Sequence, residues 1–125
     1  MLIVTCAIIE KDGKVLVAQR KATQKFGGKW EFPGGKLDPG ESYETCIKRE
    51  LREEMDVGIE ILEQLPEAPI GTIGKLIPFR CKIRSGEIKL LDHQAMKWLL
   101  PTELAGVDFT EADIPVAKRY SAKWL

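Results

Sequence analysis

The segment from Ser42 to Met55 constrains the fold most, because it contains neither glycine nor proline and carries an apolar stripe at helical spacing. A turn, Asp38-Pro39-Gly40-Glu41, precedes it, and Glu41 or Ser42 is suited to cap the first helical turn. We therefore expect a helix over residues 42–55. Its packing face consists of Tyr43, Cys46, Ile47, Leu51 and Met55.

Acidic side chains interrupt this packing face. Glu50 and Glu54 continue the i, i+4, i+7, i+11 spacing that begins at Tyr43 and Ile47, so two carboxylates stand where apolar residues are expected. Glu53 lies one turn from Glu50 at the margin of the face. An uncompensated buried charge costs on the order of several kcal/mol. A divalent cation is the natural compensator, and ligand sets of oxygen alone favour Mg²⁺ or Mn²⁺ over zinc.

From the helix alone, two interpretations of these glutamates stay open. They either hold a metal ion or pair with Lys48, Arg49 and Arg52 on a solvated face, as in many glutamate-rich helices. The preceding loop, Phe32-Pro33-Gly34-Gly35, favours the metal, because glycines let backbone carbonyls and amides approach a ligand closely. A glycine loop that leads into an acidic helix is able, together with that helix, to bind one metal ion and one phosphate chain.

Apolar runs separated by turn signals predict strands around this helix. Residues 2–9 and 14–19 flank Lys11-Asp12-Gly13, which predicts a β-hairpin. We expect further strands at 30–32, 59–65, 73–83 and 95–100, a helical turn at 101–104 and a closing helix at 111–124. Pro78 would place its strand at a sheet edge or at a bulge. Strands mixed with helices predict an α/β layered fold, built as one domain over residues 1–125.

Composition and charge exclude several classes of protein. Nineteen basic and nineteen acidic side chains cancel, which argues against long nucleic acid as a partner. The apolar run from Leu2 to Ile9 is far too short to span a bilayer and lacks the features of a signal peptide, so we expect no membrane association. Three widely spaced cysteines argue against a disulfide framework or a zinc site and predict reduced thiols in a cytoplasmic protein. The sequence does not give the oligomeric state.

The loop and helix together resemble the Nudix hydrolases. The family motif reads G-x5-E-x7-R-E-U-x-E-E-x-G-U, where U is a bulky aliphatic residue. Gly35, Glu41 and the run from Arg49 to Val57 match eight of its nine specified positions. The departure is Asp56, which stands where the family has the glycine that ends the helix. Asp tolerates a left-handed conformation less well than Gly, so the departure concerns the helix end and removes no metal ligand.

The resemblance covers nearly the whole chain. The segment from Trp30 to Lys36 is similar to the entry strand and loop of MutT-like members, and the segments Leu16–Arg20, 92–98 and 112–115 are similar to later parts of the same proteins. The subgroup that it resembles contains MutT and CTP pyrophosphohydrolases. The resemblance implies an α/β/α sandwich around a mixed β-sheet.

The implied activity is Mg²⁺-dependent conversion of a nucleoside triphosphate and water to a monophosphate and pyrophosphate, with Mn²⁺ as a substitute metal. The expected substrate is an oxidised or modified dNTP, such as 8-oxo-dGTP, or CTP or dCTP, in a housecleaning role. Two alternatives stay open: an enzyme for another nucleoside diphosphate-linked substrate, and a catalytically silent nucleotide-binding module. Retention of Glu50, Glu53 and Glu54 argues against the silent module.

The resemblance also assigns roles to residues, which follow as expectations. The metal ligands would be Gly34, Gly35, Glu50, Glu53 and Glu54. The residues placed in the catalytic group are Arg49, Glu53, Glu54 and Asp92, of which Arg49 would act by pairing with Glu41 or Glu53. The substrate-binding residues would be Arg20, Lys25, Glu31, Phe32, Pro33, Gly34 and Asp113.

Some of these residues have alternative roles. Asp113 either reads the edge of the base, where a carboxylate would favour an amino group or ring N–H, or caps the last helix. Asp92 is either a metal ligand or general base, or a turn residue. Arg20 and Lys25 either contact the substrate or are solvated loop charges. His93, the only histidine, is expected to be solvated or structural, and we leave it out of the catalytic group.

Overall fold

The chain begins with the predicted hairpin. Strands β1 (Leu2–Lys11) and β2 (Lys14–Arg20) are antiparallel, with Lys11 opposite Lys14. Asp12 and Gly13 form the connecting turn with φ of 52° and 76°, the left-handed conformation that a tight hairpin turn requires. The computed structural model describes residues 1–124.

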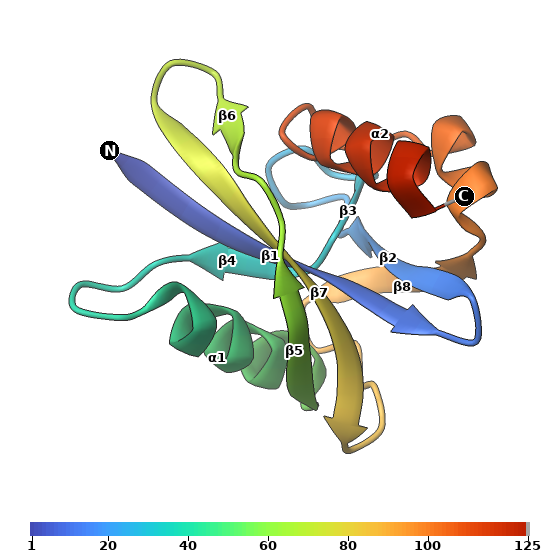
Figure 1. The fold of residues 1–125 in the computed structure, drawn as a ribbon, viewed down its shortest axis with the longest axis horizontal. Helices are drawn as coiled ribbons and strands as arrows, with labels where there is room; N and C mark the ends of the chain where they lie inside the picture. Colours follow the sequence, from blue (N-terminus) through green and yellow to red (C-terminus); the bar gives the residue numbers. More distant parts are fainter. Residues whose placement is uncertain (125) are drawn as a thin grey trace.

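β1 is the centre of a mixed sheet (Figure 1). It runs parallel to β7 (Gly74–Ser85) on one side and antiparallel to the short strand β4 (Gly34–Lys36) on the other. Strands β5 (Gly58–Gln64) and β6 (Ala68–Ile70) pair with β7, whereas β3 (Trp30–Glu31) and β8 (His93–Leu99) pair with β2. The pairing of β1 with β4 carries the glycine loop to the middle of the sheet.

Two helices cover the sheet on opposite faces, which confirms the predicted α/β/α sandwich (Figure 1). Alternate residues of β1 face different helices: Ala7 and Ile9 pack in the cluster that contains α1 (Tyr43–Met55), and Cys6 and Ile8 pack in the cluster that contains α2 (Asp113–Trp124). A short 3-10 helix, η1 (Pro101–Gly106), precedes α2. The sheet is therefore buried on both sides, as its Val- and Ile-rich strands require.

Pro78 was expected at a sheet edge or at a bulge, and the edge position is wrong; the nearer register shift between β5 and β7 lies opposite Arg80 and Cys81. β7 lies between β1 and β5, and Pro78 is opposite Cys6 of β1. On the other side of β7, the pairing with β5 ends at Phe79 and the pairing with β6 begins at Leu76. Pro78 therefore falls between two partner strands, where an absent N–H breaks no ladder bond, and its carbonyl accepts from the Leu65 N–H.

Strands β4 and β6 were not predicted from the sequence. β4 contains Gly34 and Gly35, which we expected to form only a loop, and β6 contains Pro69. Both strands are three residues long, too short for an alternating pattern to identify them. Pairing with the longer strands β1 and β7 therefore forms them.

The acidic helix α1 has the predicted beginning and a departure at its end. Ser42 accepts a hydrogen bond from the Thr45 N–H at 3.1 Å, as an N-cap residue does. Asp56 ends the helix in the left-handed conformation, with φ of 55° and ψ of 39°. The motif position that is usually glycine thus keeps the glycine conformation, although a residue with a Cβ occupies it.

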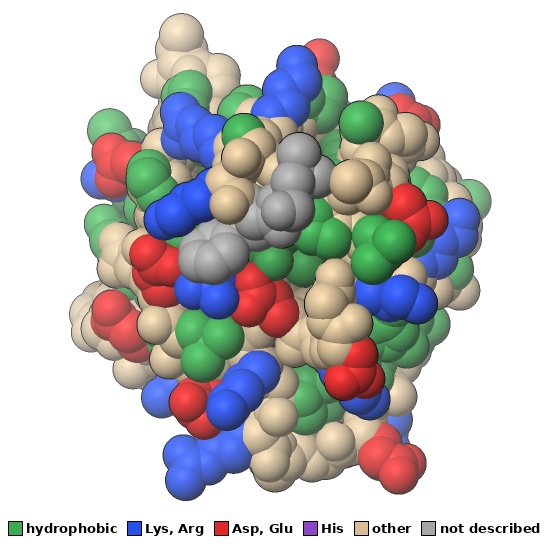
Figure 2. Space-filling model, turned by 45° about the vertical axis from the view of Figure 1, so that its right-hand side comes forward, with side chains coloured by type: hydrophobic (Ala, Val, Ile, Leu, Met, Phe, Trp, Pro, Cys, Tyr) green, Lys and Arg blue, Asp and Glu red, His purple; other side chains and the backbone are tan. Residues whose placement is uncertain are grey.

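The sequence argued against a nucleic-acid-binding surface, a disulfide framework and a membrane span, and the structure can be compared with each of these expectations. On the face drawn in Figure 2, lysine and arginine side chains are interspersed with aspartate and glutamate side chains. Cys6, Cys46 and Cys81 are buried and unpaired. None of the described helices is long and apolar enough to cross a membrane.

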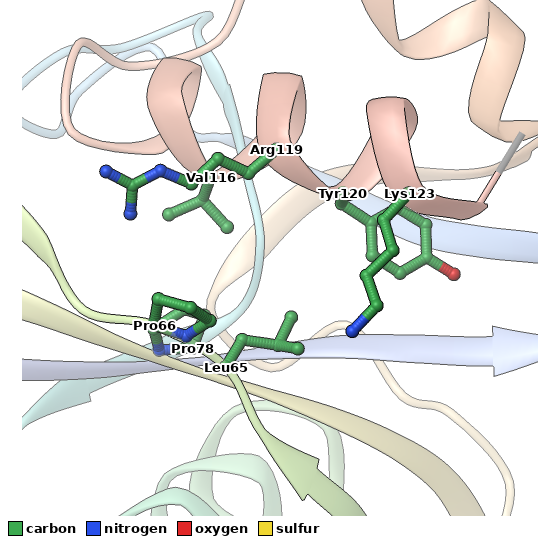
Figure 3. Close-up of a pocket in the computed structure, with 7 residues that line it drawn as sticks. All are labelled: Leu65, Pro66, Pro78, Val116, Arg119, Tyr120 and Lys123. Carbon is green, nitrogen blue, oxygen red and sulfur yellow. The ribbon is translucent and has the colours of Figure 1, made fainter.

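A cavity of about 240 Å³ lies between α2 and the sheet (Figure 3). Val116, Arg119, Tyr120 and Lys123 approach it from α2, and the strand side supplies Leu65 and two prolines. None of these residues belongs to the set that the motif singles out.

Candidate active site

Glu54 is a buried carboxylate surrounded by other carboxylates. Its side chain projects from the last turn of α1, the residue is 7% exposed, and its Oε2 has no hydrogen-bond partner among the described residues. Burial, together with the charges of Glu31, Glu50 and Asp92, raises the pKa of Glu54 from its ordinary value to about 9, against a lowering contribution from the Gly34 N–H. Among the described residues, no lysine or arginine forms an ion pair with Glu54 itself.

Glu50 lies against the glycine loop. A Cβ placed on Gly35 would come within 2.4 Å of the Glu50 carboxyl carbon, so only glycine leaves room for this carboxylate. Arg49 donates to Glu50 Oε1 at 2.9 Å. Burial raises the pKa of Glu50 above its ordinary value, although the nearby Arg49 guanidinium acts to lower it. A side chain at position 35 would therefore displace the Glu50 carboxylate from its observed position.

Arg49 ties the loop to the helix. It forms a bidentate pair with Glu41, with N–O distances of 2.7 and 3.0 Å, and donates to Glu53 at 3.2 Å and to the Lys36 carbonyl at 3.1 Å. The hydrogen bonds from Arg49 lower the pKa of Glu41 to about 2. We expected Arg49 to pair with Glu41 or Glu53, and in the structure it donates hydrogen bonds to both. Glu53 itself is largely exposed at the rim.

Glu31 and His93 form the other wall of the acidic cluster. His93 Nε2 lies 2.8 Å from Glu31 Oε2 and 3.9 Å from Glu54 Oε2, and Arg20 donates to Glu31 Oε1 at 3.0 Å. His93 is only 3% exposed. The expectation of a solvated histidine is therefore wrong, and a structural role stays a prediction. The only signal in the sequence was its place in the segment 92–98 that resembles the family.

Asp92 is held beside Glu54 by a glutamine from a distant loop. Gln24 donates through Nε2 to Asp92 Oδ1 at 3.1 Å, and its own Oε1 accepts from the Lys21 N–H. Gln94 accepts from the Ala22 N–H at 3.2 Å, which adds a second link between the same two segments. Neither glutamine was assigned a role from the sequence, because a single uncharged side chain carries no pattern.

Asp113 faces the glycine loop from the start of α2. Its Oδ2 accepts from the Phe32 N–H at 2.7 Å, and the residue is 6% exposed. Burial raises the pKa of Asp113 to about 7, although the bonds from Phe32 and Thr110 lower it. The carboxylate thus binds the backbone of a segment 81 residues away.

Several of the expected substrate-binding residues are engaged elsewhere. The Phe32 ring is buried in the core, with its centroid 5.2 Å from that of Phe109, and Pro33 is also buried. The Arg20 Nε donates to the Lys25 carbonyl at 2.7 Å, and the Lys25 Nζ lies 5.1 Å from the Phe26 ring centroid. Of the same set, Glu31 belongs to the acidic cluster, the Arg20 guanidinium donates to Glu31, and Gly34 and Asp113 contact the cluster or its loop.

The two glycine carbonyls are not equivalent. The Gly35 carbonyl accepts from the Thr5 hydroxyl at 3.3 Å and lies 3.8 Å from the Cys46 sulfur. Thr5 is fully buried. Of the two carbonyls expected to bind metal, that of Gly35 is therefore already bound by protein groups.

The donor set fits a divalent metal ion. Glu54 has a buried oxygen without a partner, Glu50 occupies a space that a Cβ at Gly35 would fill, and Asp92 and Glu31 add negative charge nearby. A buried, like-charged cluster of this kind is stable in ionised form only with a compensating cation. The carboxylates are hard oxygen ligands of the type that Mg²⁺ and Mn²⁺ prefer.

Comparison with known proteins agrees with this geometry. The NUDIX domain profile matches residues 1–124. The chain is 36% identical over 125 residues to the CTP pyrophosphohydrolase of Escherichia coli. The aligned region covers 98% of this chain and 93% of that protein. It is 45% identical over 56 residues to the 8-oxo-dGTP diphosphatase of Proteus vulgaris, covering 45% and 48% of the two chains. The solution structure of the E. coli ORF135 protein superimposes with a TM-score of 0.82 at 34% identity, covering 98% of this chain and 89% of that one.

Proposed function

The chain belongs to the NUDIX domain family, and on this basis we propose that it is a divalent-metal-dependent nucleoside triphosphate pyrophosphohydrolase. The reaction is the hydrolysis of a nucleoside triphosphate to a monophosphate and pyrophosphate. The proposed substrates are CTP or dCTP and oxidised or modified dNTPs such as 8-oxo-dGTP. Relatives named for both activities support this range.

The observation that carries the proposal is the buried, unpartnered Glu54 oxygen within a group of carboxylates. A protein that used α1 only for packing would gain stability from an apolar residue at this position. We propose Glu50, Glu53 and Glu54 as the carboxylate ligands of Mg²⁺, with the carbonyl of Gly34 as the backbone ligand. The engagement of the Gly35 carbonyl by Thr5 favours Gly34 over Gly35.

When bound, divalent metal ions neutralise phosphate oxygens and lower the pKa of a bound water. The chain's own residues do the rest. Arg49 holds Glu41, Glu50 and Glu53 in a fixed arrangement through its five donors. We propose that Asp92, held by Gln24, accepts a proton from the attacking water.

Asp113 is the proposed contact to the base. It lies at the N-terminus of α2 beside Phe32, and its burial favours the protonated form near neutral pH. A protonated carboxyl both donates and accepts hydrogen bonds, so it is able to read a base edge that presents both functions. The other expected role, capping α2, has less support, because Oδ2 binds the Phe32 N–H of a different segment.

The test is a hydrolysis panel with Mg²⁺, using the common NTPs and dNTPs, 8-oxo-dGTP, 5-methyl-dCTP, ADP-ribose and a dinucleotide polyphosphate. We expect a monophosphate and pyrophosphate from one triphosphate far above the others. Turnover of ADP-ribose or the dinucleotide alone would move the assignment to another NUDIX substrate class. Nucleotide binding without turnover would indicate a silent module.

Glu54→Gln is the matching variant, and Glu44→Gln is its control on the same helix, where the side chain is exposed. Gln keeps the size of the side chain and removes its charge, so we expect Glu54→Gln to abolish turnover while the protein stays folded. Glu44→Gln should keep full activity. Activity retained in a folded Glu54→Gln protein would contradict the assignment of Glu54 as a metal ligand.

A further inference from the structure

We propose that Glu31, Glu54 and His93 form a mixed nitrogen and oxygen site for a divalent transition metal ion, beside the carboxylate site proposed for Mg²⁺. The two sites would share Glu54, so the inference rests on the proposed function to that extent. His93 and Glu31 have no place in the family motif of residues 35–57.

Three donor atoms come together from three separate segments. Glu31 lies on β3, Glu54 on α1 and His93 at the start of β8, and one ligand atom of each lies within 4.8 Å of the others. His93 Nε2 is 2.8 Å from Glu31 Oε2 and 3.9 Å from Glu54 Oε2. Two donors at about 2.1 Å from one ion are roughly 3.0 Å apart at a right angle and about 4.2 Å apart when opposite, so both spacings are close to those of a shared ion.

The unpartnered Glu54 oxygen points into this group. Glu54 Oε2 is buried and has no hydrogen-bond donor among the described residues, and His93 Nε2 is at 3.9 Å, beyond hydrogen-bonding distance. A buried carboxylate oxygen without a partner is costly. A cation between these two atoms would satisfy the oxygen, whereas the observed side chains alone do not.

The ligand set selects the class of metal. Imidazole nitrogen suits the later first-row transition metals, and carboxylates suit Mg²⁺ and Mn²⁺, so a site with both favours ions from Mn²⁺ to Zn²⁺ over Mg²⁺. Arg20 donates to the other oxygen of Glu31 at 3.0 Å and fixes its orientation, as hydrogen bonds to metal-bound carboxylates commonly do.

The other ring nitrogen of His93 limits the affinity. Nδ1 is buried and has no partner among the described residues. Without metal, the Nε2–H donates to Glu31; with metal at Nε2, the ring proton moves to Nδ1, where no described side chain accepts it. Metal-binding histidines normally donate this N–H, and its loss typically weakens binding on the order of 10–100-fold. We therefore expect a site weaker than a histidine site with such a partner.

The single histidine makes the test unambiguous. Electron spin echo modulation of Mn²⁺ bound to the full chain, free of a polyhistidine tag, detects imidazole nitrogen bonded to the ion, and only His93 is able to supply it. We expect this nitrogen signal in the wild type, and we expect it to persist in excess Mg²⁺. His93→Gln should lose the signal and bind Mn²⁺ at this position at least tenfold more weakly, whereas the Glu44→Gln control should keep both.

A second measurement needs no variant of the buried histidine. In the wild-type protein labelled with ¹⁵N-histidine, Zn²⁺ should shift the Nε2 resonance of His93, and Mg²⁺ should not. Mn²⁺ bound without nitrogen coupling, or an unchanged Nε2 resonance, would overturn the inference while leaving the carboxylate site of the proposed function intact. Absence of any Mn²⁺ binding would overturn both.

Discussion

Replacing Asp113 by Asn should stabilise the protein, and the gain should grow with pH. Burial raises the pKa of Asp113 from 3.8 to about 7. In the unfolded chain the carboxyl loses its proton near its ordinary pKa, whereas the folded protein retains it up to about pH 7. Between these values the folded state binds more protons, so the stability of the wild type falls as pH rises through this interval and levels off above it.

The magnitude follows from the width of the interval. It spans about three pH units, and each unit corresponds to about 1.4 kcal/mol, so the full penalty above pH 7 is about 4 kcal/mol at most. Asn keeps an oxygen for the Phe32 N–H and has a similar size, but its hydrogen bond is weaker than that of a carboxylate. We therefore expect a net gain of about 2 kcal/mol at pH 8 and none near pH 4.

Thermal and urea unfolding of both proteins at intervals from pH 4 to pH 8, without metal or nucleotide, measures this difference. For a chain of this length, 2 kcal/mol corresponds to a rise in Tm of roughly 8 °C. Asp108→Asn is the control, because Asp108 is an exposed carboxylate paired with Lys29 and should show little pH-dependent change.

Two results would refute the reasoning. A stability difference that does not vary with pH would mean that the Asp113 carboxyl has the same pKa in both states. A destabilised Asp113→Asn protein at pH 8 would mean that the bonds from Phe32 and Thr110 outweigh the cost of burying the charge.

Asp56→Gly should stabilise the protein by about 0.5–1 kcal/mol in urea unfolding, because glycine adopts the left-handed helix end without strain. An unchanged or lower stability would indicate that the contacts of Asp56 with Arg52 and Lys89 outweigh this strain. Arg49→Lys should lower kcat/KM by about tenfold in the Mg²⁺ assay, because lysine does not form the bidentate pair with Glu41. Circular dichroism should show an unchanged fold, and full activity of the lysine variant would contradict the positioning role of Arg49.

Local patterns identified most of the elements. The hairpin turn at Asp12-Gly13, the Ser42 cap and the acidic α1 all follow from residues within a few positions of one another. The short strands β4 and β6 do not, because three residues are too few for a periodic signal and depend on pairing with β1 and β7.

Pro78 shows the limit of a local rule. Its missing N–H predicted an edge strand or a bulge. The N–H is indeed not needed for a ladder hydrogen bond, but the strand itself is not at an edge. The gap between β5 and β6 leaves Pro78 without a ladder partner on that side, while Cys6 of β1 lies opposite it on the other. The break in pairing depends on where two other strands end, which the sequence around Pro78 does not contain.

By itself, the sequence determined the family motif, the acidic face of α1 and the glycine loop that precedes the helix. Only the tertiary structure decided which side chains meet there. His93 and Glu31 are 62 residues apart, and Asp113 and Phe32 are 81 apart. Contacts over such separations leave no periodic trace, because they depend on sheet order and on the register of β3 and β8 beside β2. Helix and turn signals are local, and so the sequence carries them, whereas the site is long-range and depends on the packed sheet.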